Sequence, residues 1–187
     1  MINVTSEGIA VSDVSTPGFS EFLGYWNELC RDRFAPTWDD VELFDLPAKL
    51  LPYLTVVEVA ADVADFVFRF CGTAHMTTKT RDYTALSVRS IRPENLAEVI
   101  FEQYRRTVEA REPMAFVRTI HGFSEDQPLS QINLRMPLSD DGDKVTGVIS
   151  LAHWQHQLGL RAFYMHHGRG LQRVPVAEPE LRLQASQ

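Results

Sequence analysis

The chain has 187 residues, of which 44% are hydrophobic, and this is enough for a single globular domain with a buried core. Its formal net charge is −7, with the acidic residues spread along the chain. Neither nucleic acid nor an anionic membrane is therefore expected as a partner. No apolar run is long enough to span a bilayer, and the first residues lack the pattern of a signal peptide, so we expect a cytoplasmic protein.

The N-terminal part divides into a loose segment and a helix. Residues 1–15 are small and polar with isolated valine and isoleucine residues, and we expect a flexible N-terminus there. Residues 16–35 predict an amphipathic helix, because Thr16 can cap it and apolar residues recur at helical spacing. The apolar stripe is covered either by the same domain or by the same stripe of a second subunit. In the second case the chain is a homodimer whose interface contains Phe19, Phe22, Leu23, Trp26 and Leu29.

The first two strands are predicted at residues 54–60 and 66–71, from their β-branched and aromatic content. A four-residue hairpin loop would place Val57 opposite Phe70 and Val59 opposite Phe68, with all four side chains on the core face. In that register Glu58 and Arg69 pair on the other face. A short helix follows, with His75 in its first turn.

A long helix and three further strands complete the expected domain at residues 36–154. The helix is predicted between Pro93 and Pro113, and the strands at 114–121, 130–138 and 144–154. The segment "SDDGD" predicts a hairpin in which Met136 faces Val145, Leu134 faces Gly147 and Ile132 faces Ile149, with His153 continuing the inner face. The fold class is therefore α+β with a five-stranded antiparallel sheet, followed by a partly disordered extension at 155–187.

Several segments resemble a known family when their order and spacing are taken together. They are "DLPAKLLPYLTVVEV" at 45–59, "FVFRFCGT" at 66–73, "RDYTA" at 81–85, "REPMA" at 111–115 and "MPLSDDGDKVTGVIS" at 136–150. In these segments the chain resembles bacterial stand-alone PAS-domain proteins over roughly residues 22–152. It departs from them at Thr84-Ala85, where the family usually has Thr-Gly.

The resemblance implies a PAS-like fold, with a five-stranded sheet, helices across one face and an N-terminal helix outside the core. PAS domains bind small molecules or cofactors between sheet and helices, or relay signals through protein contacts. The motif residues name no ligand, so the cofactor stays open. The candidate pocket is the predicted inner face, which also fits an ordinary hydrophobic core: Phe68, Phe70, His75, Tyr104, Phe116, Leu134, Ile149 and His153.

Other chemistry is less well supported by the residues. Cys71 and His75 could form a thiolate and imidazole pair, but no acid or amide stands nearby to orient the histidine, and we expect both cysteines to be reduced and buried. The spacing of His153 and His156, with His166 and His167 later, is compatible with zinc but lacks the acidic general base of a zinc protease. No metal site and no catalytic residue are predicted.

The sequence therefore favours a non-enzymatic sensory or regulatory protein. It would bind a small molecule or a protein partner and signal through the packing of its N-terminal helix. Two alternatives stay open at this point. One is a ligand-free adaptor for protein interactions, and the other is a small α+β enzyme.

Overall fold

The computed structural model describes residues 2–60, 63–123 and 127–167. In these ranges the chain forms one antiparallel sheet of six strands in the order β1-β4-β5-β6-β2-β3. The strands are β1 (Asn3–Ile9), β2 (Leu54–Val59), β3 (Phe66–Cys71), β4 (Met114–His121), β5 (Leu129–Leu138) and β6 (Gly147–Trp154). The helices are α1 (Phe19–Cys30), α2 (Thr73–Lys79), α3 (Glu94–Ala110) and α4 (Gln157–His167). Of the helices in these ranges, none combines the length and the apolar character needed to cross a membrane.

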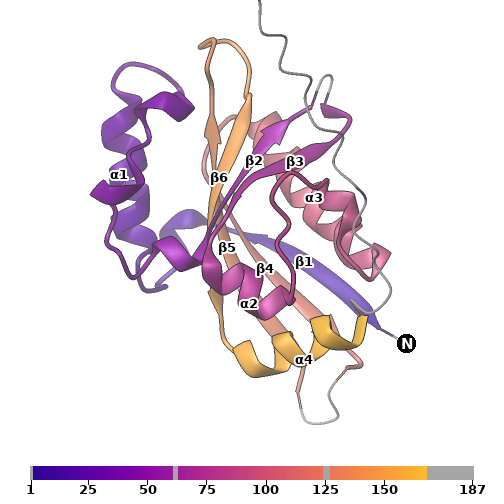
Figure 1. Cartoon of the computed structure of the whole chain (residues 1–187). Helices are drawn as coiled ribbons and strands as arrows, with labels where there is room; N and C mark the ends of the chain where they lie inside the picture. Colours follow the sequence, from indigo (N-terminus) through magenta and orange to yellow (C-terminus); the bar gives the residue numbers. More distant parts are fainter. Residues whose placement is uncertain (1, 61–62, 124–126, 168–187) are drawn as a thin grey trace, which may run out of the picture.

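Both faces of the sheet are covered, so the molecule has three layers (Figure 1). Helix α1 lies against one face, and α2, α3 and α4 lie against the other. Strands β2 to β6 with α2 and α3 give the α+β, PAS-like arrangement that the resemblance implies, and β1 adds a sixth strand to the expected five. The two apolar clusters, one on each side of the sheet, are called here the α1-side core and the helix-side core.

The N-terminal segment is a strand, so the expectation of a flexible N-terminus is wrong for Asn3–Ile9. This strand pairs with β4 from Asn3 opposite His121 to Ile9 opposite Ala115. Pairing satisfies the backbone hydrogen-bonding groups of β4 that would otherwise form an open edge. Val4, one of the isolated apolar residues, packs against the helix-side core.

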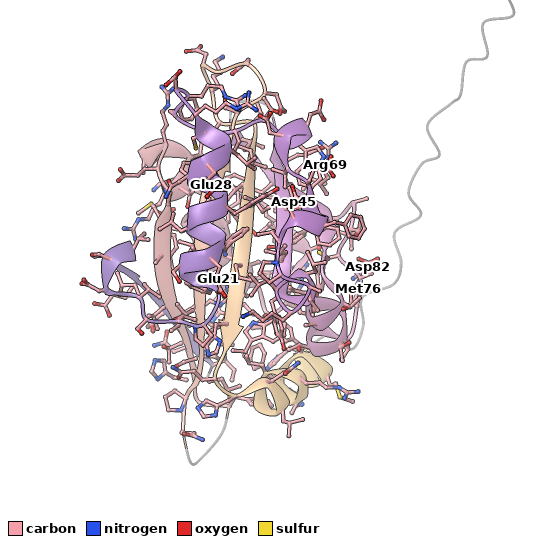
Figure 2. The ribbon with its side chains drawn as sticks, turned by 90° about the vertical axis from the view of Figure 1, so that its left-hand side faces the viewer. Glu21, Glu28, Asp45, Arg69, Met76 and Asp82 are labelled. Atoms are coloured by element: carbon pink, nitrogen blue, oxygen red, sulfur yellow. The ribbon has the colours of Figure 1, made fainter. Side chains whose placement is uncertain are left out.

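Helix α1 covers the sheet of its own chain, which is the first of the two alternatives for its apolar stripe. Phe19, Phe22 and Trp26 are buried there, and the Trp26 Nε1 group donates a hydrogen bond to the carbonyl oxygen of Pro137, 2.9 Å away. These three residues are therefore not free to meet a second subunit, whereas Leu23 and Leu29 are half-buried. The acidic residues of α1, labelled in Figure 2, are exposed.

The β2–β3 register differs from the prediction by two residues. Val57 lies opposite Phe68, and a bulge between Val56 and Val57 then places Val56 opposite Phe70. Because the bulge inserts one extra residue, it turns the Phe70 side chain to the α1 side of the sheet. Phe70 therefore does not share the face of Phe68, as the unbulged hairpin requires.

The ion pair expected across this hairpin is confirmed. The Arg69 Nη1 and Glu58 Oε1 atoms are 2.9 Å apart, and both side chains are solvent-exposed. The Arg69 guanidinium also lies 5.0 Å from the centre of the Trp38 ring. Arg69 is thus held on the outer surface, away from the space between sheet and helices.

The β5–β6 hairpin has a longer loop than the sequence suggested. Leu138 lies opposite Gly147 and Met136 opposite Ile149, so the predicted pairing of Met136 with Val145 is wrong by four residues. The loop is stabilised by Asp141, whose Oδ1 atom accepts hydrogen bonds from the backbone N–H groups two and three residues later. Such side-chain caps favour a wide, ordered turn over a two-residue hairpin turn.

The C-terminal extension is a helix for part of its length. Residues 157–167 form α4, in which Leu160, Phe163 and Tyr164 are buried in the helix-side core. The spacing of these three residues places them on one helix face, which explains why the segment folds onto the sheet. The remainder of the extension expected to be partly disordered, residues 168–187, lies outside the described residues.

Candidate functional site

The candidate site lies between the sheet and helices α2, α3 and α4, and it begins with the alternation of β5. Ile132, Leu134 and Met136 of β5 face α1, so the intervening side chains face the other helices. Those intervening residues are Gln131, Asn133 and Arg135, and in the neighbouring strand Arg118 stands opposite Gln131. Because three helices cover this face, the polar residues are buried, and each arginine is only 2% exposed.

Arg135 is held from three sides. Its Nη1 atom donates to Ser150 Oγ of β6 at 3.1 Å, and its Nη2 atom donates to Gln103 Oε1 of α3 at 2.8 Å. The guanidinium carbon lies 3.7 Å from the centre of the Tyr104 ring, a cation–π contact. Gln103 continues this network, because its Nε2 atom donates to Ser6 Oγ of β1 at 2.8 Å. Arg135 is thereby linked through α3 to the N-terminal strand.

Arg118 is held by the side-chain amides of β5. Its Nη2 atom donates to Gln131 Oε1, and Gln131 Nε2 donates to Asn133 Oδ1 at 2.8 Å. Burial lowers the pKa of Arg118 and of Arg135 from the ordinary value. Because the guanidinium group starts from so high a pKa, both side chains remain charged.

Helix α2 brings a lysine to the same layer. Lys79 is 7% exposed, and its Nζ atom lies 5.2 Å from the centre of the Phe68 ring and 5.3 Å from that of Tyr83. Burial lowers the pKa of Lys79 to about 8. The ammonium group is therefore surrounded by aromatic faces rather than by acidic side chains.

His75, in the first turn of α2, is buried and neutral. Burial, followed by the nearby Lys79 charge, holds the pKa of His75 well below its ordinary value. Its Nε2 atom lies 2.9 Å from the carbonyl oxygen of Tyr53. A carbonyl oxygen can only accept a hydrogen bond, so we assign the proton to Nε2, which leaves Nδ1 as an acceptor. The ring also packs edge-on against Trp154, with the centres 4.9 Å apart.

Several polar atoms of this layer lack a hydrogen-bond partner among the described residues. They are Arg118 Nε, Arg135 Nε, Asn133 Nδ2, Tyr164 Oη and His75 Nδ1, all of them buried. The great majority of buried polar atoms in proteins have a partner. Their concentration between one sheet face and its helices makes this layer the candidate site.

The predicted pocket residues divide between the two faces of the sheet. Phe68, His75, Tyr104 and Phe116 lie on the side of α2, α3 and α4. Phe70, Leu134 and Ile149 pack on the α1 side. His153, half-buried, stands opposite Ile132 and so faces the α1 side as well. The eight residues therefore do not line one pocket, because the sheet separates them.

The sequence analysis missed the charged and amide residues of the site. Gln131, Asn133 and Arg135 alternate with apolar residues, and a polar strand face is ordinarily read as the solvent face. One signal could have corrected this interpretation. Strand 144–154 is apolar on both faces, which indicates that both faces of the sheet are covered, and the polar face of the adjacent strand must then be buried too.

The remaining chemistry considered from the sequence finds no assembled centre. Cys30 and Cys71 are free buried thiols, and burial raises the pKa of each. Cys71 packs in the helix-side core, and in the described residues no hydrogen bond joins it to His75. Within 2–60, 63–123 and 127–167, no three His, Cys, Asp or Glu side chains are grouped so that they could hold a metal ion.

The comparisons with known proteins find likenesses among solved structures only. No family model matches the chain, and no curated protein matches it. The chain is similar to a solved structure described as an RNA-binding light-oxygen-voltage receptor, with a TM-score of 0.41 and 13% sequence identity. The match covers 89% of this chain and 42% of that chain, so this chain spans less than half the length of the receptor it matches.

Proposed function

We propose that the protein is a sensory or regulatory domain of the PAS type that binds a small molecule between its sheet and helices α2, α3 and α4. The observation that carries the proposal is the group of buried polar atoms without partners in this layer. An unsatisfied buried polar atom costs about 1–3 kcal/mol, and a ligand with complementary polar groups would remove that cost. Protein ligand sites commonly combine apolar surroundings with a few polar groups, and this layer contains side chains of both kinds.

The network around Arg135 offers a route from this site to the N-terminus. The hydrogen bonds from Arg135 to Gln103 and from Gln103 to Ser6 reach strand β1, and the chain runs from β1 to α1. A ligand that moves Arg135 would alter the contacts that hold β1 at the sheet edge. For this to be a signal, the ligand must bind the two arrangements with different affinity. The route uses β1 and needs no second subunit at the buried stripe of α1.

The first experiment asks whether a ligand is present. The full chain is purified and denatured, and the released small molecules are identified by mass spectrometry. We expect one compound in amounts close to that of the protein. The variant Asn133→Leu, which replaces the side chain bearing the partnerless Nδ2 group with one of similar volume, should release much less. Asn27→Leu, on the exposed part of α1, should release as much as the wild type. Absence of any such compound from the wild-type protein would count against the proposed function.

The second experiment follows the coupling to β1. Hydrogen exchange of the Asn3–Ile9 amides is compared in the ligand-bound and ligand-free protein, with the expectation that the ligand changes their protection. In Ser6→Ala the hydrogen bond from Gln103 to β1 is lost and the bond from Arg135 to Gln103 is kept, so the change in protection should disappear while the compound still binds. An equal change in the wild type and this variant would show that the route does not pass through Gln103.

A further inference from the structure

We propose that the ligand is an anion, a small organic carboxylate held by Arg118, Arg135 and Lys79. This inference rests on the proposed function and adds the chemical class of the ligand. It is carried by two observations. The first is the sign of the buried charges, and the second is the kind of polar atom that lacks a partner.

All buried charged side chains in the described part of the chain are positive. They are Lys79, Arg118 and Arg135, and no aspartate or glutamate is buried in these residues. Helices α2 and α4 contain no acidic residue, and the four glutamates of α3 are exposed. The ion pairs found in the described residues join other side chains. The protein therefore brings three cationic groups inside without supplying a countercharge there.

This arrangement is unfavourable without an anion. A buried charge is normally paired, because removal from water costs several kcal/mol that only a nearby opposite charge offsets. A buried lysine can release its proton, but an arginine cannot do so at any ordinary pH. The stacking of Arg135 on Tyr104 compensates part of the cost for one of the two guanidinium groups. A bound anion would supply the missing charge for both.

The partnerless atoms match a carboxylate. Three of them are N–H donors, namely Arg118 Nε, Arg135 Nε and Asn133 Nδ2, and an ionised carboxylate is an acceptor only. The planar guanidinium group is suited to carboxylate oxygens, with charge-assisted hydrogen bonds stronger than neutral ones. His75 Nδ1 is an acceptor and Tyr164 Oη can donate or accept, so a hydroxyl group on the same molecule would satisfy either of them.

The binding test uses the full chain after unfolding, dialysis and refolding. It is titrated with a panel of small mono-, di- and hydroxycarboxylates, with the uncharged amide of each, and with inorganic phosphate. We expect a carboxylate to raise the melting temperature while its amide does not. Arg118→Met should weaken binding of that carboxylate by at least about 30-fold, and Arg118→Lys should restore part of it. Arg105→Met, on the outer surface of α3, should bind as the wild type does.

A second measurement does not depend on knowing the ligand. In the ligand-free protein, Arg118→Met should leave the melting temperature unchanged or raise it, because it removes an uncompensated buried charge. A fall of more than about 5 °C would show that Arg118 already has its partner in the folded protein, and the inference would be overturned. Arg118 is preferred to Arg135 for this test because it makes fewer hydrogen bonds within the protein.

The outcomes separate this inference from the proposed function. If the compound released on denaturation is uncharged, or if the amides bind as well as the acids, the anion assignment fails and the sensory function stands. If phosphate stabilises the protein and no carboxylate does, the carboxylate assignment is wrong. If nothing is released and no member of the panel binds, both proposals fail.

Discussion

Replacing Phe22 with alanine should lower the free energy of unfolding by about 3–5 kcal/mol, because this side chain has no exposed surface and packs between α1 and the sheet. The loss combines the transfer of the ring out of an apolar environment with the cavity left behind. With a slope of about 2–3 kcal/mol per molar urea for a chain of this size, the unfolding midpoint should fall by roughly 1–2.5 M. Equilibrium urea unfolding, followed by circular dichroism, measures this directly.

The matched control is Phe44→Ala, since Phe44 is 92% exposed and its removal should change the free energy of unfolding by less than about 0.5 kcal/mol. The oligomeric state of both variants is measured by light scattering. If Phe22→Ala left the unfolding midpoint unchanged but altered the oligomeric state, the stripe of α1 would be a subunit interface and the account of the α1-side core would be refuted.

Three further predictions concern stability, and each is read from urea unfolding. Gly72→Ala should lower the free energy of unfolding by at least about 1–3 kcal/mol, because a Cβ atom there would lie 2.4 Å from backbone oxygens. Gly24→Ala, which has open space around it, should raise the free energy of unfolding by about 0.5–1 kcal/mol, and equal effects of the two variants would contradict the packing described. The pKa of Asp40 is lowered to about 2, mainly by hydrogen bonds from Thr37. The wild type should therefore have a higher free energy of unfolding than Asp40→Asn above pH 4, and this difference should vanish as the pH falls through 2. A difference that does not change with pH would exclude the capping box of Thr37 and Asp40. The pKa of Lys79 is 10.5 in the unfolded chain and about 8 in the folded protein, so the unfolded state binds more protons between these pH values. The free energy of unfolding of the ligand-free wild type should therefore rise relative to that of Lys79→Met from pH 8 to pH 10.5. If the difference between the two proteins did not change with pH, Lys79 would be solvated.

Local pattern was sufficient for the elements whose signal lies within one segment. The long helix, the amphipathic helix and the middle strands appear where the spacing of apolar residues predicts them, and the Glu58–Arg69 pair forms. Register was not predictable in the same way. The bulge between Val56 and Val57 and the loop stabilised by Asp141 each shift the pairing, and a pattern of apolar residues encodes neither of them.

The candidate site was harder to predict because it depends on which layer covers each face. Arg135 and Asn133 lie on the polar face of an alternating strand, and only the packing of α2, α3 and α4 over that face makes them buried. The helix that brings Tyr164 lies in the segment that was expected to be a partly disordered extension. Strand β1 contains few apolar residues, and it forms by pairing with β4, which lies more than a hundred positions later in the sequence. Each of these contacts is long-range in the sequence.

The most direct test of the central claim is an experimental electron-density map of the protein purified without refolding. The account predicts connected density from a small molecule within hydrogen-bond distance of Arg118 Nε, Arg135 Nε or Asn133 Nδ2, in the layer between the sheet and helices α2, α3 and α4. A well-resolved map in which ordered water or an acidic side chain of the protein satisfies these atoms would contradict it.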